Sequence, residues 1–418
     1  MKALRFLLLL VSTSLYAQSL ETTNPESAGL SEDRLLRLTQ TFEQYVSEGQ
    51  LSGSVILVAR KGKIAYLESF GLQDMEQEVP MEKNTIFRIA SQTKAIISVG
   101  IMMLQEEGKL LITDPVGKYL PPFMETTVAV AGEDGSYEVM PAKRPITIRD
   151  LLTHTSGVGY GGGVAADRWE EAGIQGWYFA DRDEPILETV NRMAALPFEA
   201  QPGEKFVYGY NTDILGALIE VVSGQPLDQF LKERILDPLQ MEDTHFYLPA
   251  SKKDRLATVY SATREGLERA PDPGSMVGQG AYVDGPGKSF SGGAGLLSTA
   301  KDYAAFLQMM LNGGEYDGEH LLSPKTVELM TVDHLGEVAF PWEDGTGFGL
   351  GFSVLIDLGA RGTPGSVGEY GWGGAYHSDY WVDPEEELVV VYFTQLIPAG
   401  GLDDHAKLRA LIYGAMVE

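Results

Sequence analysis

Two side chains at the start of an apolar segment have the types and spacing needed for nucleophilic chemistry. Ser91 and Lys94 lie three residues apart in Ser91-Gln92-Thr93-Lys94, directly before a predicted helix over 95–107. Residues three apart share one face of a helix, and a helix start places the serine hydroxyl at the positive end of the dipole. A desolvated lysine one turn away is one of the few side chains that can activate a serine hydroxyl. The pattern therefore predicts an acyl-transfer nucleophile with a candidate base, although this spacing also occurs by chance.

A tyrosine in a loop is the candidate for a second group that handles protons. Tyr208 follows the turn Gln201-Pro202-Gly203 and precedes a predicted helix over 212–223. Loops held by rigid elements commonly carry such residues. Beside Lys94, the phenolate of Tyr208 would be favoured by positive charge, and it would accept the Ser91 proton and return it to the leaving group. The competing interpretation is that Tyr208 or Tyr210 is a structural core aromatic.

A glycine-rich strand edge supplies the third candidate feature. The segment Gly371-Trp372-Gly373-Gly374-Ala375 precedes a predicted hairpin, and consecutive glycines allow a close approach of backbone to substrate. An oxyanion needs two aimed donors, and the N–H groups of Ser91 and Ala375 are the predicted pair. A β-turn with a packed tryptophan is the alternative for this segment.

Predicted elements that position these residues divide the chain into two parts. Strand pairs are predicted at 54–71 and 379–395, with a closing helix at 404–417, which suggests one sheet built from both termini. The segments predicted to be helical in between are 95–107, 147–152, 186–195, 212–223, 226–235 and 300–311. We expect an α+β fold with an antiparallel sheet domain (18–85 plus 296–418), a mainly helical inserted domain (86–295) and an active site between them.

Composition narrows the class of protein. Residues 1–17 have a short basic start, an apolar run and a small residue before Gln18, which predicts a signal peptide, hence periplasmic or secreted location and no membrane span after cleavage. The net charge of −27 disfavours nucleic acid as a partner, and the absence of cysteine excludes disulfides and thiolate metal sites.

The glycine-rich stretches 157–163 and 285–295 lack P-loop spacing. We expect no cofactor and no metal; the oligomeric state is left open.

The order of these motifs resembles the serine β-lactamase superfamily. The similar branch contains class C β-lactamases, D-alanyl-D-alanine carboxypeptidases and β-lactamase-like carboxylesterases. Segments 146–157, 236–246 and 292–300 agree with it, and the resemblance extends from about Pro25 to the end of the chain. It implies a β-lactamase/penicillin-binding-protein-like fold and a nucleophilic role for Ser91.

The resemblance also separates the two tyrosines. Class C enzymes usually carry Tyr-x-Asn, whereas here Asn211 directly follows Tyr210. Tyr208 and Asp213 match the esterase-branch pattern Tyr-Ser-x-x-x-Asp-x-Leu-Gly, so the resemblance favours Tyr208 as the catalytic tyrosine and leaves Tyr210 as a substrate-binding candidate.

A tryptophan replaces the lysine of the family's third motif. Trp372-Gly373-Gly374 stands where β-lactamases have Lys-Thr-Gly, whose lysine supplies positive charge beside a substrate carboxylate. A charge-assisted contact of that kind contributes about 1.5–3 kcal/mol. We therefore predict weak handling of β-lactams and D-Ala-D-Ala termini and better handling of uncharged esters, with substrate contacts from Trp372, Gly373 and Gly374.

Two histidines lie near the motifs, and other reaction classes remain as alternatives. His154 is predicted to have a structural loop role, and His377 to line the substrate pocket. No Gly-x-Ser-x-Gly elbow and no His-Glu-x-x-His pattern occurs, which disfavours an α/β-hydrolase triad and metal hydrolysis. The leading hypothesis is an exported serine carboxylesterase acting on a small-molecule ester. The alternatives are a D-amino acid peptidase or weak β-lactamase, and a non-catalytic ligand-binding or penicillin-sensing module.

Overall fold

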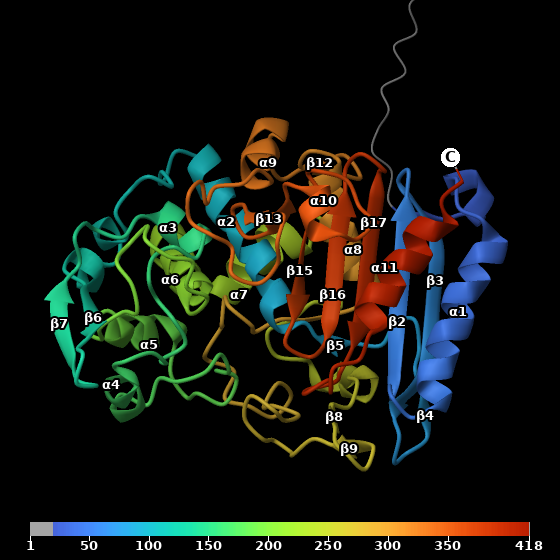
Figure 1. The fold of residues 1–418 in the computed structure, drawn as a ribbon, viewed down its shortest axis with the longest axis horizontal. Coiled ribbons are helices and arrows are strands. Elements are labelled where there is room, and N and C mark those ends of the chain that lie inside the picture. The colour runs from blue at the N-terminus through green and yellow to red at the C-terminus, as the bar shows by residue number, and fades with distance from the viewer. Residues whose placement is uncertain (1–19, 418) are drawn as a thin grey trace, which may run out of the picture.

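A nine-stranded sheet built from both ends of the chain forms the centre of the computed structural model, which describes residues 20–417 (Figure 1). The order along its main path is β1-β3-β2-β17-β16-β15-β14-β13, and β4 pairs with β3. The strands are β1 (Glu21–Thr22), β2 (Gly53–Arg60), β3 (Lys63–Asp74), β4 (Val79–Pro80), β13 (Thr346–Phe348), β14 (Ser353–Leu355), β15 (Tyr370–Gly374), β16 (Ser378–Asp383) and β17 (Leu388–Thr394). The β1–β3 pair is parallel and the others are antiparallel, so the predicted antiparallel sheet is confirmed apart from this short pair.

The central strands β2 and β17 are buried on both faces of the sheet. Successive side chains of a strand point to opposite faces, and both strands are rich in apolar residues, with Val and Ile in β2 and Val, Tyr and Phe in β17. Leu57 pairs with Val391 and belongs to one hydrophobic core, whereas Ile56 pairs with Tyr392 and belongs to the other. The sheet therefore separates two cores, and each must be covered by helices.

Helices from distant parts of the chain cover the two faces. On one face α1 (Glu32–Ser47) packs beside α11 (Asp404–Ala415), and both contribute to the core that contains Ile56 (Figure 1). On the other face α8 (Ala300–Leu311) packs against β2, β16 and β17, and α2 (Thr93–Glu106) contributes to the same core. The nucleophile candidate Ser91 lies in the turn that leads into α2. Because α2 belongs to this core, its packing positions the turn.

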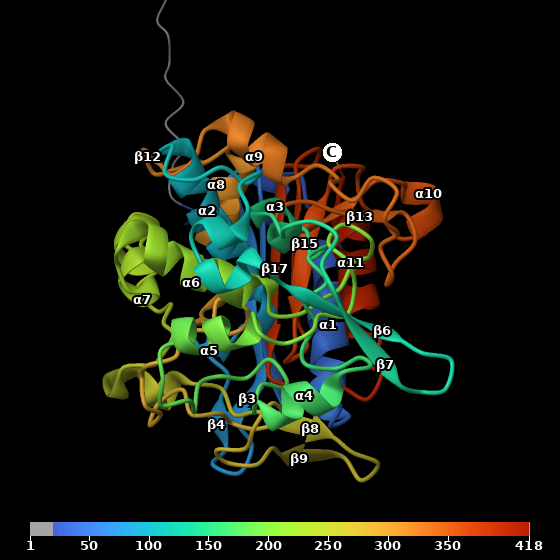
Figure 2. The ribbon, with the colours of Figure 1, turned by 90° about the vertical axis from the view of Figure 1, so that its left-hand side faces the viewer.

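The middle of the chain is largely helical. Its helices are α3 (Ile148–Leu152), α4 (Ala166–Glu171), α5 (Ile186–Met193), α6 (Asn211–Ser223) and α7 (Leu227–Leu231). Two hairpins accompany them, β6 (Thr127–Ala131) with β7 (Tyr137–Pro141) and β8 (Tyr260–Ala262) with β9 (Leu267–Arg269). The β6–β7 hairpin projects from the body of the molecule (Figure 2).

Short elements join the middle of the chain to the sheet. β5 (Phe87–Arg88) pairs with β10 (Leu297–Ser298), so the chain leaves the sheet region and returns to it at one place. The remaining elements are β11 (Glu315–Tyr316), β12 (Glu319–His320), α9 (Pro324–Met330) and α10 (Leu358–Arg361). One hydrophobic core contains side chains of both parts, and the predicted division at 85/86 and 295/296 stays a prediction.

Most predicted elements are confirmed, with differences at their ends. The first hairpin turns at Lys61 and Gly62, which both have positive φ, as a tight two-residue hairpin turn requires. The helix predicted over 226–235 is α-helical only to Leu231, because residues 232–236 form a π-helical turn. Helix α6 ends before Gly224, whose φ of 73° lies in the left-handed region.

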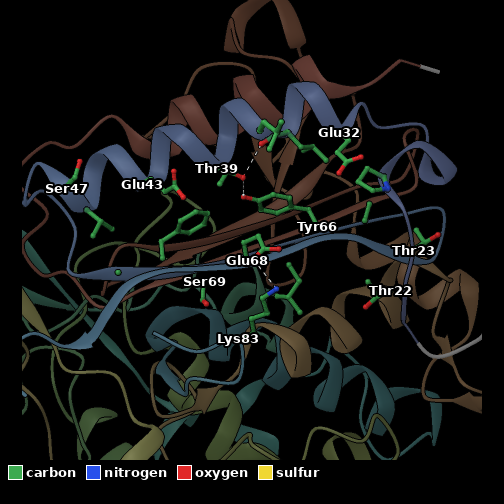
Figure 3. Close-up of a pocket in the computed structure, with 18 residues that line it drawn as sticks. Thr22, Thr23, Glu32, Thr39, Glu43, Ser47, Tyr66, Glu68, Ser69 and Lys83 are labelled. Carbon is green, nitrogen blue, oxygen red and sulfur yellow. Dashed lines mark hydrogen bonds and ion pairs between the residues drawn. The ribbon is translucent and has the colours of Figure 1, made fainter. Parts of the chain in front are cut away.

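A large cavity lies between α1 and β3, away from the predicted site. Its volume is about 830 Å³, and two pairs of its polar side chains interact with each other (Figure 3). The hydroxyls of Thr39 and Tyr66 are 2.9 Å apart, and Lys83 forms an ion pair with Glu68 at 3.0 Å. Ser91 is not among its lining residues, so this cavity does not contain the predicted nucleophile.

The sequence predicted a signal peptide and no membrane span after its cleavage. Within residues 20–417, no helix combines the length and apolar character needed to cross a membrane. The signal peptide predicted at residues 1–17 lies outside the described residues.

Candidate active site

Ser91 lies in a strained turn at the start of α2. A 3₁₀ turn over Ala90–Gln92 leads directly into the helix, and Ala90 is fully buried with a φ of 42°. A non-glycine residue in the left-handed region costs about 1–3 kcal/mol and persists only when its surroundings fix it. The backbone N–H of Ile89, directly before this turn, donates to the carbonyl oxygen of Leu296, the residue before strand β10, at 3.1 Å. The surrounding structure therefore fixes the backbone conformation of the turn that carries Ser91.

Lys94 is buried and has hydrogen-bond partners on several sides. Its side chain is 2 % exposed, and Nζ donates to Ser91 Oγ at 3.3 Å, to Tyr160 OH at 3.2 Å and to the carbonyl oxygen of Gly293 at 2.7 Å. A lysine ammonium has three donors, and these acceptors use all of them. The arrangement fixes Nζ beside the serine hydroxyl, as the three-residue spacing predicted.

Tyr208 lies against the same amino group. Lys94 Nζ is 4.5 Å from the centroid of the Tyr208 ring, within the range of a cation–π contact. The indole Nε1–H of Trp372 donates to the Tyr208 hydroxyl at 3.0 Å. The other face of the tyrosine contacts the His154 ring at a centroid distance of 4.6 Å. A donated hydrogen bond and a nearby cation both stabilise negative charge on a phenolic oxygen.

Tyr160 is a site residue that sequence reasoning missed. It lies in the glycine-rich stretch 157–163, which lacks P-loop spacing and in which we predicted no site residue, and its hydroxyl accepts the hydrogen bond from Lys94. Burial, followed by the nearby Tyr208, raises the pKa of Tyr160 well above its ordinary value, so this phenol keeps its proton. The signal in the sequence was a single aromatic residue inside a run of glycines.

Tyr210 occupies a different environment from Tyr208. It is fully buried, and its hydroxyl donates to the carbonyl oxygen of Gly176 at 2.7 Å. Its ring contacts Trp169 and Phe179 in the core of the middle region. These contacts are those of a structural aromatic, so they do not support the predicted substrate-binding role of Tyr210.

The start of α6 has no side-chain cap. The N-cap residue is Tyr210, and no side chain caps the helix. Asn211 instead turns inward, where its Nδ2 bonds to His154 Nδ1 at 2.9 Å and to the carbonyl oxygen of Val158 at 3.1 Å, and its Oδ1 accepts from the Ser156 hydroxyl. Buried polar groups need partners, and this asparagine joins the loop before Tyr160 to the loop that carries Tyr208.

Asp213 also turns inward and supports the carbonyl that holds Lys94. Its Oδ1 accepts hydrogen bonds from Ser291 Oγ at 2.6 Å and from the N–H of Gly293 at 3.0 Å. Burial raises the pKa of Asp213, although these donors and Lys94 act in the opposite direction. The residue acts through Gly293 on the position of Lys94, so it is a positioning residue.

His154 supports Tyr208 as an uncharged ring. Its φ of 54° places it in the left-handed region, and the side chain is buried between Asn211 and the Tyr208 ring. Burial, followed by the charge of Lys94, lowers the pKa of His154 well below its ordinary value. These contacts agree with the predicted structural loop role.

The glycine edge of β15 comes close to the nucleophile turn. A Cβ atom added to Gly374 would lie 2.7 Å from the carbonyl oxygen of Ile89, a distance that real Cβ atoms do not show. Glycine is therefore required where this strand passes the turn that carries Ser91. Ala375 directly follows this point, and the pairing of its N–H with that of Ser91 as an oxyanion hole stays a prediction.

His377 points away from these groups. Its Nε2 is 2.7 Å from Asp404 Oδ1, and its ring stacks on His405 at a centroid distance of 4.1 Å. Both partners belong to the first turn of α11. These contacts give no support to the predicted substrate-binding role of His377, which stays a prediction.

Aromatic side chains surround Trp372 beside the reacting groups. Trp342 is 56 % exposed, and its ring lies 5.2 Å from that of Tyr208 and 5.6 Å from that of Trp372. The remaining members of this aromatic patch are Phe206, Phe340 and Phe348. The patch offers an apolar surface that is partly open to solvent.

A charged cavity of about 380 Å³ adjoins the aromatic patch. Trp372, Gly373, Arg361 and Arg409 are among its lining residues. Both arginines bond to Glu369, with N–O distances of 3.0 and 2.7 Å. The positive charges of these two arginines are therefore already paired within the protein.

Comparison with known proteins identifies the family. The family model described as Beta-lactamase matches residues 38–414. Esterase EstB of Burkholderia gladioli is 34 % identical over 86 % of this chain and 89 % of its own length, and N-acetylmuramyl-L-alanine amidase of Bacillus subtilis is 28 % identical over 89 % and 83 %. The solved structure of EstCE1, described as a hydrolase with promiscuous acyltransferase activity, matches with a TM-score of 0.78 and 29 % identity over 91 % of this chain and 99 % of that chain. These matches confirm the predicted fold, and the chain belongs to the β-lactamase family of serine hydrolases.

Proposed function

We propose that this protein is a carboxylesterase that forms an acyl-enzyme at Ser91 and acts on uncharged, short-chain esters. One observation carries the proposal: the buried Lys94 Nζ lies 3.3 Å from Ser91 Oγ and 4.5 Å from the centroid of the Tyr208 ring. A nucleophile, a cation and a proton acceptor are thus gathered at the start of one helix. The similarity to Esterase EstB, and to EstCE1 as a hydrolase with acyltransferase activity, agrees with this reaction class.

Acylation begins when Ser91 Oγ attacks the ester carbonyl carbon. The Oγ–C bond forms, the carbonyl π electrons move to oxygen, and the Ser91 proton passes to the phenolate oxygen of Tyr208. Lys94 Nζ and Trp372 Nε1 stabilise the charge on the phenolate before the transfer. When the tetrahedral intermediate collapses, the bond to the alcohol oxygen breaks and Tyr208 returns the proton to that oxygen. The alcohol leaves and the acyl group remains on Ser91.

Deacylation repeats these steps with water as the nucleophile. Tyr208 takes a proton from the water, the new C–O bond forms, and the bond to Ser91 Oγ breaks as the proton returns to the serine. The N–H groups of Ser91 and Ala375 are the proposed donors to the oxyanion in both halves. Strain in the turn at Ala90 and the close approach of Gly374 support this role, because they fix the two backbone segments against each other.

The substrate class follows from Trp372. The side chain at the third-motif position donates to Tyr208 instead of presenting a cation to a carboxylate. Arg361 and Arg409 are paired with Glu369, so a carboxylate that used them would have to compete with an existing ion pair. The aromatic patch offers burial to an apolar group at about 25 cal/mol per Å². Uncharged esters match this surface better than substrates with a free carboxylate.

A peptidase or amidase acting on D-amino acid peptides or cell-wall fragments is the second candidate. The similarity to the amidase of Bacillus subtilis favours it. A non-catalytic, ligand-sensing module is the third candidate, and the gathering of Ser91, Lys94 and Tyr208 argues against it. Export directed by residues 1–17 remains part of the proposal.

One set of assays separates these candidates. Purified protein is assayed with p-nitrophenyl acetate and butyrate, a chromogenic cephalosporin and a D-Ala-D-Ala peptide, with Ser91→Ala as the control. We expect ester turnover that is lost in Ser91→Ala and little turnover of the cephalosporin or the peptide. Preferred turnover of the peptide would establish the second candidate. A covalent adduct with a fluorophosphonate but no turnover of any substrate would establish the sensor.

A further inference from the structure

A cluster of two histidines and an aspartate lies where β15 and β16 meet α11. His377 belongs to the turn between the two strands, and Asp404 and His405 begin the helix. Each of the three residues offers one ligand atom, and these atoms all lie within 4.8 Å of one another. The cluster has no metal-ligand spacing in the sequence, because His377 and Asp404 are 27 residues apart. The fold creates the cluster.

The carboxylate at the centre is buried and oriented. Asp404 is fully buried, its Oδ1 lies 2.7 Å from His377 Nε2, and its Oδ2 accepts a hydrogen bond from the Tyr392 hydroxyl at 2.6 Å. A carboxylate that binds a metal is commonly held in this way by a hydrogen bond from outside the coordination sphere.

His405 has the second interaction that metal-binding histidines usually show. Its Nε2 lies 3.2 Å from the backbone carbonyl oxygen of His377. When Nε2 carries the proton of this hydrogen bond, Nδ1 keeps a free lone pair. A backbone carbonyl that fixes the tautomer of an imidazole is a recurrent partner of metal ligands.

His377 occupies a backbone conformation that favours glycine. Its φ is 65°, in the left-handed region, although glycines precede it at 373 and 374 in the same hairpin. A side chain at this position costs conformational energy, which its ring contacts must offset. The His377 side chain is 16 % exposed, so solvent ions reach it.

We propose that His377, Asp404 and His405 form a binding site for a divalent transition-metal ion of the zinc type. Two imidazoles and one carboxylate are ligands that suit Zn²⁺, and three protein ligands with one open position are a common zinc arrangement. Ligand atoms around tetrahedral zinc lie roughly 3.3 Å apart. Side-chain rotations that move the ligand atoms by on the order of 1 Å would bring these three atoms to that spacing. The ion would link the turn after Ala375 to the start of α11.

Zinc titration of the metal-free chain tests this site directly. The chain is treated with a chelator, dialysed and titrated with Zn²⁺ by calorimetry, and its Tm is measured with and without the ion. We expect one ion per chain and a rise in Tm, because a ligand that binds only the folded state stabilises it. His405→Gln should weaken binding at least about tenfold and abolish the rise, since even residues outside the coordination sphere contribute about 10–100-fold.

Two further variants complete the test. His377→Gly removes a ligand at a backbone position where glycine is favoured, and it should weaken binding to a similar extent. His320→Gln is the matched control, because His320 also has a carboxylate neighbour, Glu315 at 3.8 Å, but lies outside the cluster. Binding in His405→Gln equal to that of the unaltered chain, or no Zn²⁺ binding by the unaltered chain, would overturn the proposal. His405→Gln leaves the His377–Asp404–Tyr392 contacts in place, so the result does not depend on the stability of His377→Gly.

Discussion

The two sides of the candidate site differ in how their side chains are held. On the side of α2 and α6, Ser91, Lys94 and Asp213 belong to a buried chain of hydrogen bonds in which Gly293 joins the aspartate to the lysine. On the side of β15, Trp372 lies in an aromatic patch whose outermost member, Trp342, is 56 % exposed. The first side fixes reacting atoms and the second presents surface to a substrate. The comparison suggests that reaction type and substrate choice are carried by separate parts of the molecule.

Removal of the buried cation should have the largest effect. Lys94→Met should lower kcat for p-nitrophenyl butyrate by about 10²–10⁴-fold, the usual contribution of a group that assists proton transfer. Lys118→Met is the control, because Lys118 is an exposed lysine paired with Asp114. If Lys94→Met keeps its fold and its kcat, the buried lysine takes no part in the reaction.

The two neighbouring tyrosines sharpen the assignment on the buried side. Tyr208→Phe should lower kcat by about 10²-fold or more, because the proton acceptor is lost. Tyr210→Phe should leave kcat nearly unchanged and lower stability by about 0.5–1.5 kcal/mol, because its hydroxyl bonds only to the carbonyl oxygens of Gly176 and Tyr160. Rates and urea unfolding of both variants are compared, and the opposite order of rates would reassign the base.

Replacement of the tryptophan at the third-motif position tests the exposed side. Trp372→Lys should shift the ratio of kcat/KM toward a carboxylate-bearing cephalosporin over an ester by about tenfold or more, as a new charge-assisted contact of about 1.5–3 kcal/mol implies. Trp372→Phe also loses the hydrogen bond to Tyr208 but gains no charge, so its ratio should stay constant. An unchanged ratio in Trp372→Lys would mean that the residue at this position does not determine the preference for uncharged substrates.

Truncation at the edge of the aromatic patch should have a smaller effect. Trp342→Ala should raise KM for p-nitrophenyl butyrate several-fold and leave kcat nearly unchanged, because only apolar contact is lost. Leu329→Ala, another exposed apolar residue, serves as the control outside the patch. If kcat falls instead of KM rising, the patch takes part in the reaction and the separation of the two sides fails.

The buried side should also show a pH dependence of stability. The folded-state pKa of His154 lies well below its usual value of about 6.5, so below that pH the unfolded chain binds a proton that the folded chain does not. Stability should therefore fall with decreasing pH by up to about 1.4 kcal/mol per pH unit from this residue. The unfolding free energy of His154→Gln should have a shallower slope between pH 6.5 and 5 than that of the exposed-histidine control His320→Gln. Equal slopes would mean that His154 is charged in the folded protein.

The sequence predicted the features that depend on local spacing. Ser91 and Lys94 share one turn, so their contact follows from helix geometry, and the hairpin at Lys61 and Gly62 follows from turn chemistry. The inward rotation of Asn211 and Asp213 was not predictable, because their partners Ser156 and Ser291 come from loops that are distant in the sequence. Tyr160 was missed for the same reason: its role depends on a long-range contact with Lys94.

Mass spectrometry of the trapped intermediate shows whether an acyl-enzyme forms at Ser91. The protein is mixed with p-nitrophenyl butyrate, quenched with acid during turnover, digested and mapped, with Ser91→Ala treated in parallel. The account predicts a butyryl group on the peptide that contains Ser91 and no label in the variant. A label on another residue, or ester turnover that persists in Ser91→Ala, would contradict it.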